Sequence, residues 1–419
     1  MTLLKSRVES ANTPDTDFPL NNLPFGIFST EGTAPRAATA LGDRIVDLAV
    51  LEADGRIDAG APVFGAAELN PFMERGPAAW AAVRAQLQAL FAEGATTPVE
   101  DALSPLAAAR MHLPFRVAEY TDFYASKRHA MNVGTMFRGP ENALPPNWLH
   151  IPIGYNGRAS SVVVSGTDIL RPNGQRKGPD EEVPSFGPSR RMDIELEMGA
   201  VVGVPSPMGK PITVDEAEEM IFGYVMLNDW SSRDIQAWEY APLGPFQGKA
   251  FGTSISPWVV TRAALEPFRV PVPPREKPLL PYLDQSLPGL YDIALEVGMQ
   301  PEGAGQETVI TRTNYRNLYY SAAQQLAHHA VGGCGMRVGD LLGSGTISGE
   351  EKGSFGSLLE LSWGGKEPIT LAGGETRSFI EDGDRLTFRG AALGEGYRVG
   401  FGECTGRILP AVPGPWGAK

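Results

Sequence analysis

The sequence predicts a mainly β fold of the α+β class. Its 419 residues include 49 glycines and 36 prolines spread along the chain, which indicates many turns. Residues 192–198 alternate apolar and acidic side chains with a period of two, the pattern of a β-strand. Short apolar segments broken by glycine and proline, such as FGIFST and AATALGDRIVDLAV, indicate small strands elsewhere.

The first part of the chain, residues 1–115, is expected to form its own domain. A polar lead-in precedes the small strands of 18–50. A helix is expected at about 77–93, because four apolar side chains fall near one helical face: Trp80, Val83, Leu87 and Leu90. A second short helix is expected in VEDALSPLAAA. The connector MHLPFR then leads to a domain boundary near residue 115, beyond which the chain becomes polar, aromatic and basic.

The second part, residues 116–419, begins with a loop and a strand in NWLHIPIGYNGRASSVVVSGTDI and a turn-rich hairpin in RPNGQRKGPDEEVPSFGPS. The acidic strand follows. The segment VDEAEEMIFGY predicts a helix that leads into a strand ending at Asp229. A short helix or turn and another strand are then expected in SSRDIQAWEYAPLGPFQGKAFGTSISPWVV.

The last part of the chain predicts further strands in YDIALEVGMQ, FIEDGDRLTFRGAAL and RVGFGECTGRILPA. A helix ending at glycine is expected in NLYYSAAQQLAHHAVGG. Residues 267–289 are rich in proline and are expected to lie on the surface without regular structure. The glycine-rich segment RVGDLLGSGTISGEEKGSFGSLLELSW is expected to end in a strand.

The acidic strand is the first candidate for chemistry. Glu195 and Glu197 are two residues apart, so their side chains project from one face, with Asp193 beside them. Like charges repel, and burial strengthens the repulsion. Such a strand is stable if the acids face water or if a cation lies between them, and this pattern leaves both alternatives open. Asp229 offers a third acid, and carboxylate ligation suits Mg²⁺, Ca²⁺ or Mn²⁺ rather than zinc.

His129 is the main candidate for a general base. It lies in a segment, 122–138, that also contains aspartate, tyrosine, arginine and lysine, and imidazole titrates near neutral pH. The alternative is a structural or exposed histidine, which is the commoner role of a lone histidine. His328 and His329 lie on an expected helix and are interpreted as core or surface residues.

Two further segments combine polar residues with glycines. Residues 229–253 contain Arg233 and Lys249, which can hold a carboxylate or stabilise an oxyanion, although a solvated loop with ordinary ion pairs explains them equally well. Residues 343–360 place Thr346 in a glycine loop that a ligand can approach closely. This loop lacks the Lys-Ser/Thr ending of a P-loop and the G-x-G-x-x-G of a dinucleotide fold.

Charge and composition argue against several classes of protein. The net charge of −13 disfavours binding to nucleic acid or to an anionic membrane. No run of 18 apolar residues and no signal-peptide core are present, so a soluble, cytoplasmic protein is expected. Cys334 and Cys404 do not make a disulfide framework and are expected to be small buried residues. No G-x-S-x-G motif supports an α/β-hydrolase.

Five segments spread over nearly the whole length carry a resemblance: TDFYASKRHAMNVGTMFRG, GYNGRASSVVVSGT, MDIELEMGAVVG, VMLNDWSSRDIQAWEYAPLGPFQGKAFGTSISPWVV and GSGTISG…GSLLELSW. With them, the chain resembles the fumarylacetoacetase family. The pattern Glu195-x-Glu197…Asp229 alone is shared with a wider superfamily that includes acylpyruvate hydrolases, decarboxylases and hydratases. The stretch DFYASKRHA and the preceding N-terminal domain narrow the resemblance to the fumarylacetoacetases.

The resemblance implies an SH3-like β barrel over residues 1–115 and a large β-roll catalytic domain over 116–419, assembled as a homodimer. It implies Mg²⁺ and/or Ca²⁺ as cofactor. The implied reaction is metal-dependent hydrolysis of a carbon–carbon bond in 4-fumarylacetoacetate, a β-diketo dicarboxylate. The products are fumarate and acetoacetate, and the reaction is the last step of tyrosine and phenylalanine catabolism.

The resemblance also implies roles for individual residues. The implied metal ligands are Asp122, Glu195, Glu197 and Asp229, with Lys249 and Thr253 beside a second Mg²⁺ position. An ammonium has no lone pair to donate, so Lys249 is interpreted as an electrostatic partner. His129 is the implied proton acceptor, oriented by Glu360, and the oxyanion site comprises Arg233, Gln236 and Lys249. The implied substrate contacts are Tyr124, Arg138, Gln236, Tyr240 and Thr346.

Two other functions stay open. The chain can be a different enzyme of the superfamily, such as an acylpyruvate hydrolase or a decarboxylase, which product analysis would distinguish. It can also be a non-catalytic binding protein in which a metal clamps the acids to stabilise the fold. In that case His129, Glu360 and Lys249 would tolerate substitution.

Overall fold

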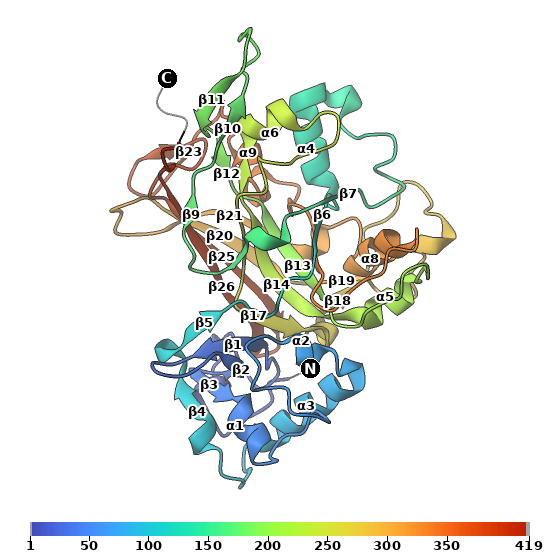
Figure 1. Cartoon of the computed structure of the whole chain (residues 1–419), viewed down its shortest axis with the longest axis vertical. Helices are drawn as coiled ribbons and strands as arrows, with labels where there is room; N and C mark the ends of the chain where they lie inside the picture. The colour runs from blue at the N-terminus through green and yellow to red at the C-terminus, as the bar shows by residue number, and fades with distance from the viewer. Residues whose placement is uncertain (1, 416–419) are drawn as a thin grey trace.

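A computed structural model describes residues 2–415 and shows two parts that share one large sheet (Figure 1). The N-terminal part lies at the bottom of Figure 1, and the larger C-terminal part lies above it. The main path through the shared 13-stranded sheet is β4-β3-β2-β1-β17-β14-β13-β22-β6-β7. Strands β5, β8 and β16 pair with members of this path or with each other. The expected mainly β architecture with accompanying helices is confirmed.

The N-terminal part combines short strands with helices. Its strands are β1 (Phe25–Ser29), β2 (Arg36–Leu41), β3 (Arg44–Asp47), β4 (Leu103–Pro105) and β5 (Arg110–His112). Its helices are α1 (Leu48–Ala53), α2 (Asn70–Met73) and α3 (Gly76–Phe91). Helix α3 confirms the helix expected at 77–93, and it buries Trp80, Val83 and Leu87 while Leu90 stays half-buried.

The second helix expected in the N-terminal part is wrong. Residues 99–109 form two 3-10 turns, Glu100–Ala102 and Leu106–Ala108, on either side of β4. Pro105 explains the break, because proline removes a backbone donor and disfavours helical geometry at the residue before it. The segment instead adds an edge strand, with Ser104 opposite Ile45 of β3. Within residues 2–415, no pairing closes these strands into a ring.

The C-terminal part contributes the other strands of the shared sheet and a second, five-stranded sheet ordered β21-β20-β25-β26-β9. The strands in the shared sheet are β6 (Tyr120–Phe123), β7 (Gly154–Asn156), β8 (Val162–Val164), β13 (Leu196–Val202), β14 (Ile221–Asp229), β16 (Thr253–Ile255), β17 (Trp258–Thr261) and β22 (Leu341–Gly343). The second sheet contains β9 (Ile169–Leu170), β20 (Ala294–Gln300), β21 (Thr308–Asn314), β25 (Arg385–Gly394) and β26 (Tyr397–Leu409).

Smaller strand pairs and helices complete this part. The pairs are β10 (Asn173–Arg176) with β11 (Ser185–Pro188), β12 (Met192–Asp193) with β15 (Ser231–Ser232), β18 (Arg269–Val270) with β19 (Leu290–Tyr291), and β23 (Ile369–Thr370) with β24 (Thr376–Arg377). The helices are α4 (Lys127–Arg138), α5 (Val214–Met220), α6 (Arg233–Glu239), α7 (Arg262–Leu265), α8 (Ala322–Ala330) and α9 (Leu358–Leu361).

Helix signals in the sequence are confirmed at α5 and α8. Thr213 and Glu216 form a capping box that begins α5, which leads into β14 as expected. Ser321 and Gln324 form the same motif at α8. The proline-rich segment 267–289 carries little regular structure: it contains the end of a 3-10 turn at Glu266–Phe268, the short strand β18 and a 3-10 turn at Pro281–Leu283.

The acidic strand differs from its expectation in two ways. It is interrupted after Asp193, because β12 pairs with β15 while β13 begins at Leu196. Asp193, Glu195 and Glu197 are as buried as their apolar neighbours, so the alternative in which these acids face water is wrong. The reason is the position of β13, which pairs with β14 on one side and β22 on the other and is covered on both faces.

The glycine-rich segment near the end of the chain is also corrected. Its strand, β22, lies at its beginning, and its end forms the short helix α9 instead of a strand. The hydroxyl of Ser357 accepts a hydrogen bond from the N–H of Glu360, the usual start of a helix. Cys404 is buried as expected, whereas Cys334 is exposed.

Two large apolar clusters form the core, and the second of them joins the two parts. One fills the C-terminal part between its sheets and helices. The other combines N-terminal residues such as Phe25 and Phe72 with Phe222 and Val225 of β14. The N-terminal part therefore packs its core directly on one face of the strands that carry the acids. No helix within residues 2–415 is long and apolar enough to cross a membrane.

Candidate active site

Four carboxylates meet where strands of the shared sheet come together. Each contributes an oxygen, and these oxygens all lie within 4.8 Å of one another. The residues are Asp122 on β6, Glu195 just before β13, Glu197 on β13 and Asp229 at the end of β14. All four are buried. The strand order β14-β13-β22-β6 explains why acids far apart in the sequence come together.

Gly343 makes room for this cluster. It ends β22, the strand between β13 and β6, and lies opposite Asp122 in the register. A Cβ atom at this position would lie 2.6 Å from Oδ1 of Asp122 and 3.0 Å from Oε2 of Glu197. The absence of a side chain therefore allows the two carboxylates to approach each other.

The cluster fits a divalent cation. Burial, together with the charge of Asp229, raises the pKa of Asp122 well above its usual range, and burial with the charge of Asp122 does the same for the pKa of Glu197. Oδ1 of Asp122 and Oε1 of Glu197 are buried and have no hydrogen-bond partner in the described part of the chain. Burying such oxygens costs free energy unless a positive charge lies beside them. An all-oxygen donor set suits Mg²⁺ or Ca²⁺.

Two cations lie on the other side of the cluster. Lys249 Nζ contacts Glu195 and lies 2.9 Å from Oδ2 of Asp229. Arg233 places Nη1 2.7 Å from Oε1 of Glu195. Although burial opposes ionisation, Lys249 and Arg233 hold the pKa of Glu195 below its usual range. Lys249 and Arg233 thus balance part of the negative charge of the four carboxylates.

Asp229 also accepts hydrogen bonds from two hydroxyl groups. Thr253 donates to its Oδ1 at 3.1 Å, and Tyr155 donates to its Oδ2 at 2.8 Å. Burial, followed by the charges of Asp229 and Asp122, raises the pKa of Tyr155 well above its usual range, so the phenol stays protonated and can donate. These bonds fix the orientation of the carboxylate.

A histidine–glutamate pair lies beside the acids. Ser126 caps α4, which carries His129, and Nδ1 of His129 lies 2.7 Å from Oε2 of Glu360 on α9. Burial opposes ionisation of Glu360, but the charge of His129 and hydrogen bonds outweigh it and lower the pKa of Glu360. Because an ionised carboxylate only accepts, Nδ1 is the nitrogen that carries a proton towards Glu360, and Nε2 is the nitrogen that can act as a base.

These groups line one cavity of about 480 Å³. Its polar wall contains Asp122, Tyr124, His129, Arg138, Tyr155, Glu195, Arg233, Gln236, Tyr240, Lys249 and Thr346. Its apolar wall includes Phe137 on α4 and Leu243 in the loop after α6. A larger, more open groove of about 1410 Å³ lies beside the β10–β11 hairpin, but among residues 2–415 Glu239 is the one ionisable side chain in its wall. The smaller cavity is therefore the candidate active site.

The remaining expected residues lie behind this wall and contact it. Glu360 holds His129, and Glu197 accepts a hydrogen bond at 2.9 Å from the N–H of Gly345, which lines the cavity. Asp229 contacts Lys249, and Thr253 contacts Asp229. Every residue expected at the site thus lines the cavity or contacts a residue that lines it, except Thr253, which reaches the wall through Asp229.

Comparison with known proteins agrees with the resemblance seen in the sequence. Residues 119–408 match the family model described as fumarylacetoacetate (FAA) hydrolase, C-terminal, and residues 21–114 match fumarylacetoacetase, N-terminal. The chain belongs to the fumarylacetoacetase family. The family's two-part architecture corresponds to the two parts of this structure.

Curated members of the fumarylacetoacetase family are similar to nearly the whole chain. The Arabidopsis thaliana protein named fumarylacetoacetase is 50% identical over 424 residues, covering 99% of this chain and 100% of the relative. The Rattus norvegicus protein of the same name is 51% identical over 408 residues, and the Homo sapiens protein is 50% identical over 408 residues. Each of these two comparisons covers 95% of this chain and 97% of the relative.

More distant solved structures share the fold. Fumarylacetoacetate hydrolase from Exiguobacterium antarcticum superimposes with a TM-score of 0.54 at 15% identity, covering 93% of this chain and 99% of the other. Maleylpyruvate hydrolase from Sphingobium sp. SYK-6 gives a TM-score of 0.50 at 14% identity, covering 93% and 100%. At such low identity the likeness shows the fold alone.

Several residues at the site of this fumarylacetoacetase-family chain were not expected from the sequence. Asp193 was expected beside the other acids but pairs with Arg233, whose Nε lies 2.8 Å from its Oδ2. Tyr155 donates to Asp229, and Asn132 donates to Glu360 at 2.9 Å; neither contact is predicted by the sequence. No spacing or motif marks them, because their partners lie far away in the sequence.

Proposed function

We propose that this protein hydrolyses a carbon–carbon bond of 4-fumarylacetoacetate to give fumarate and acetoacetate, the last step of tyrosine and phenylalanine catabolism. One observation carries the proposal: a buried histidine–glutamate pair, a four-carboxylate cluster and two cations converge on one cavity. Relatives that carry the name fumarylacetoacetase at about half identity over nearly the whole chain support it.

The four carboxylates are proposed to hold Mg²⁺ or Ca²⁺, with Lys249 and Thr253 beside them. When bound, the ion supplies positive charge that stabilises the enolate of the leaving group. Lys249 does not ligate, because an ammonium has no lone pair. Its charge lowers the pKa of Glu195, although burial alone would raise it, and its Nζ also pairs with Asp229.

His129 is proposed to take a proton from water as the water attacks a carbonyl carbon of the substrate. Glu360 fixes the ring so that Nε2 is the basic nitrogen. General base catalysis of this kind typically contributes about 10²–10⁴-fold to the rate. The T-shaped contact between Tyr124 and His129, with ring centroids 5.3 Å apart, further limits the orientation of the imidazole.

Arg233, Gln236 and Lys249 are proposed to stabilise the oxyanion formed by this attack. Arg233 Nη1 donates to Oε1 of Gln236 at 3.1 Å, which leaves the amide N–H groups of Gln236 free to donate. Nη2 of Arg233 is buried and makes no hydrogen bond to any residue that the structure describes. A single preorganised donor of this kind is worth about 10²–10³-fold in kcat.

Tyr124, Arg138, Gln236, Tyr240 and Thr346 are proposed to bind the substrate. Arg138 can pair with a substrate carboxylate, although it already donates to the carbonyl groups of Asn142 and Ala143. The hydroxyl of Thr346 is buried in the cavity wall without a partner, so a ligand oxygen would satisfy it. Tyr240 is half exposed at the cavity.

Finer features of the family belong to the same proposal. The N-terminal part is proposed to be an SH3-like barrel variant of residues 1–115, and the catalytic β-roll to begin at 116; the match of residues 21–114 to the N-terminal family model supports this division. A cytoplasmic homodimer is proposed by analogy with the family.

An activity assay on the purified full-length chain tests the function. Loss of the β-diketone's ultraviolet absorbance, with fumarate and acetoacetate identified as products, is the expected result, and EDTA should abolish it. His129→Ala should lose about 10²–10⁴-fold in kcat. His150→Ala is the matched control, because His150 is exposed and outside the cavity wall. Other products, or unchanged turnover in His129→Ala, would contradict the proposal.

A substitution of Glu197 tests the cation. Its Oε1 has no hydrogen-bond partner among residues 2–415, so Glu197→Gln should weaken metal binding without breaking a hydrogen bond of that atom. Calorimetric titration of the chelated protein with Mg²⁺ or Ca²⁺ measures the affinity directly. The metal should also raise the Tm of the wild-type protein by mass action, and raise it less in the variant. Equal affinity in both proteins would contradict the ligand assignment.

A further inference from the structure

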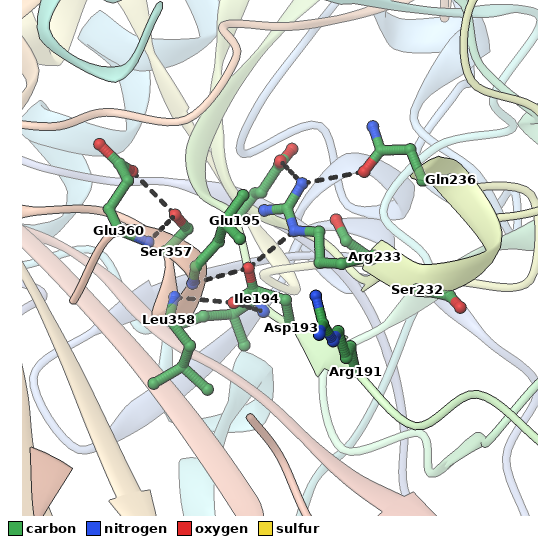
Figure 2. A network of polar contacts seen from close by, with 12 residues as sticks. Arg191, Asp193, Ile194, Glu195, Ser232, Arg233, Gln236, Ser357, Leu358 and Glu360 are labelled. Carbon is green, nitrogen blue, oxygen red and sulfur yellow. Dashed lines mark hydrogen bonds and ion pairs between the residues drawn. The ribbon is translucent and has the colours of Figure 1, made fainter. Parts of the chain in front are cut away.

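Through one buried carboxylate, Asp193 contacts both Arg233 and α9, the short helix that carries Glu360 (Figure 2). Its side chain is fully buried. Oδ2 accepts hydrogen bonds from Nε of Arg233 at 2.8 Å and from the backbone N–H of Leu359 at 3.0 Å. Oδ1 accepts from the N–H groups of Leu358 at 2.7 Å and Ile194 at 2.8 Å. One side chain thus reaches both α6 and α9.

The contact with α9 determines where Glu360 lies. This helix has four residues, too few to be stable by its own hydrogen bonds. Its first two N–H groups, those of Leu358 and Leu359, bond to Asp193, and the next bonds to Ser357. Glu360 follows directly and holds His129. The position of the general base therefore depends on the carboxylate of Asp193.

The contact with α6 determines how Arg233 is oriented. Asp193 accepts a hydrogen bond from Nε of Arg233, and this bond limits the orientation of the guanidinium plane (Figure 2). Nη1 is then directed at Oε1 of Glu195, 2.7 Å away, and Nη2 remains free and buried. The backbone supports the same arrangement, because the N–H of Arg233 donates to the carbonyl of Arg191 at 2.9 Å.

Asp193 itself neither lines the cavity nor belongs to the four-carboxylate cluster. We propose that Asp193 is a positioning residue that holds Arg233 and the Glu360–His129 pair in register with each other. The inference rests on the proposed function for its kinetic consequence, since Arg233 acts on the oxyanion and His129 on water. Both act mainly in the transition state, so misplacement of either lowers kcat more than it raises KM.

The variant Asp193→Asn tests the inference. An amide places an NH₂ group against at least one of the N–H donors, so the contact with α9 or with Arg233 is lost. Asp384→Asn is the matched control, because Asp384 is also fully buried and accepts from Arg377 Nε at 2.8 Å and from the N–H of Glu381 at 2.9 Å, away from the cavity. Asp193→Asn should lose about 10²-fold in kcat with KM near wild type, whereas Asp384→Asn should keep kcat.

A spectroscopic readout separates positioning from general stability. The chain has five histidines, so the Nδ1 resonance of His129 can be assigned in ¹⁵N-histidine-labelled protein by comparison with His129→Ala. It should shift in Asp193→Asn and stay unchanged in Asp384→Asn, both measured below their melting temperatures. If Asp193→Asn does not fold, Asp193→Glu keeps the charge and moves the carboxylate by one methylene, and it should show the same two effects.

The outcomes are distinct. Equal loss of kcat in the Asp193 and Asp384 variants, or an unchanged His129 resonance in the Asp193 variant, would overturn the inference and leave Asp193 as a clamp of the fold. A wild-type protein that does not hydrolyse 4-fumarylacetoacetate would overturn the proposed function instead. The resonance of His129 would still decide, in that case, whether Asp193 positions the pair.

Discussion

Nδ1 of His129 lies 2.7 Å from Oε2 of Glu360, although 231 positions separate the two residues in the chain. Glu360 is fully buried and also accepts from Asn132 at 2.9 Å, Ser348 at 2.9 Å and Ser357 at 2.8 Å. A buried carboxylate with so many donors remains ionised and keeps one orientation. The imidazole that it binds is therefore preorganised before any substrate enters.

Glu360→Gln should impair catalysis without impairing binding. Glutamine keeps one acceptor but loses the charge that holds Nδ1 protonated, so the basic nitrogen is no longer fixed. We expect kcat to fall roughly 10²–10⁴-fold and KM to change little, measured by steady-state kinetics.

Glu218→Gln is the control for this substitution, because Glu218 is a buried glutamate that pairs with Arg269 far from the cavity wall. It should keep kcat. A similar loss of kcat in both variants would point to a general effect of removing a buried charge rather than to the base.

The sequence predicts the chemistry of the site better than its geometry. Asp122, His129 and Lys249 are recognisable because their residue types suit a metal, a proton and an oxyanion, and because the surrounding segments resemble a family. The solvated alternative for Glu195 and Glu197 could not be excluded from alternation alone. That required the pairing of β13 with β14 and β22, which depends on residues far away in the chain.

Asp193 shows where local patterns fail. Alternation places it with Glu195 and Glu197, but the strand breaks after it, and its carboxylate turns to Arg233 and α9. The 3-10 turns around Pro105 could be anticipated from the proline itself. The contacts of Tyr155 and Asn132 with the site could not, since they arise only from tertiary packing.

Gly343→Ala should disrupt the acidic cluster. The added methyl would lie 2.6 Å from Oδ1 of Asp122, closer than van der Waals contact allows, so that carboxylate must move. We expect a loss of about 1–3 kcal/mol in the free energy of unfolding and a marked loss of the Tm increase caused by added Mg²⁺ or Ca²⁺. Differential scanning fluorimetry with and without the metal measures both effects.

Gly390→Ala provides the matched comparison for Gly343. Gly390 lies on β25 of the second sheet, and its Cβ would lie 2.6 Å from Sδ of Met226, a flexible core side chain on β14, so the cost falls on packing alone. This variant should lose some stability and keep the full response to metal. If both glycine variants respond to metal like the wild type, Gly343 does not control the cluster.

The two parts of the chain should unfold together. Phe222 of β14 contacts Trp80 and Phe72 of the N-terminal part, with ring centroids 5.0 Å and 5.9 Å away. Phe222→Ala should therefore cost about 3–5 kcal/mol and still unfold in one calorimetric transition at a lower temperature. Two separate transitions, in the wild type or in the variant, would show that the parts are independent in stability.

The pH dependence of stability gives a further check on Glu360. Burial raises its pKa, but the charge of His129 and hydrogen bonds from His129, Asn132 and Ser357 outweigh burial, so the pKa in the folded protein lies below the ordinary value of 4.5. A carboxyl group of this kind stabilises the fold at pH values above 4.5, and this contribution is lost as the pH falls through the folded pKa.

Glutamine at this position does not titrate. The difference in unfolding free energy between the wild type and Glu360→Gln, measured by urea denaturation, should therefore be larger just above pH 4.5 than below it, and should shrink as the pH falls below 4.5. A difference that stays constant over this range would mean that the pKa of Glu360 is the same in the folded and unfolded chains, and that its hydrogen bonds do not favour the ionised form.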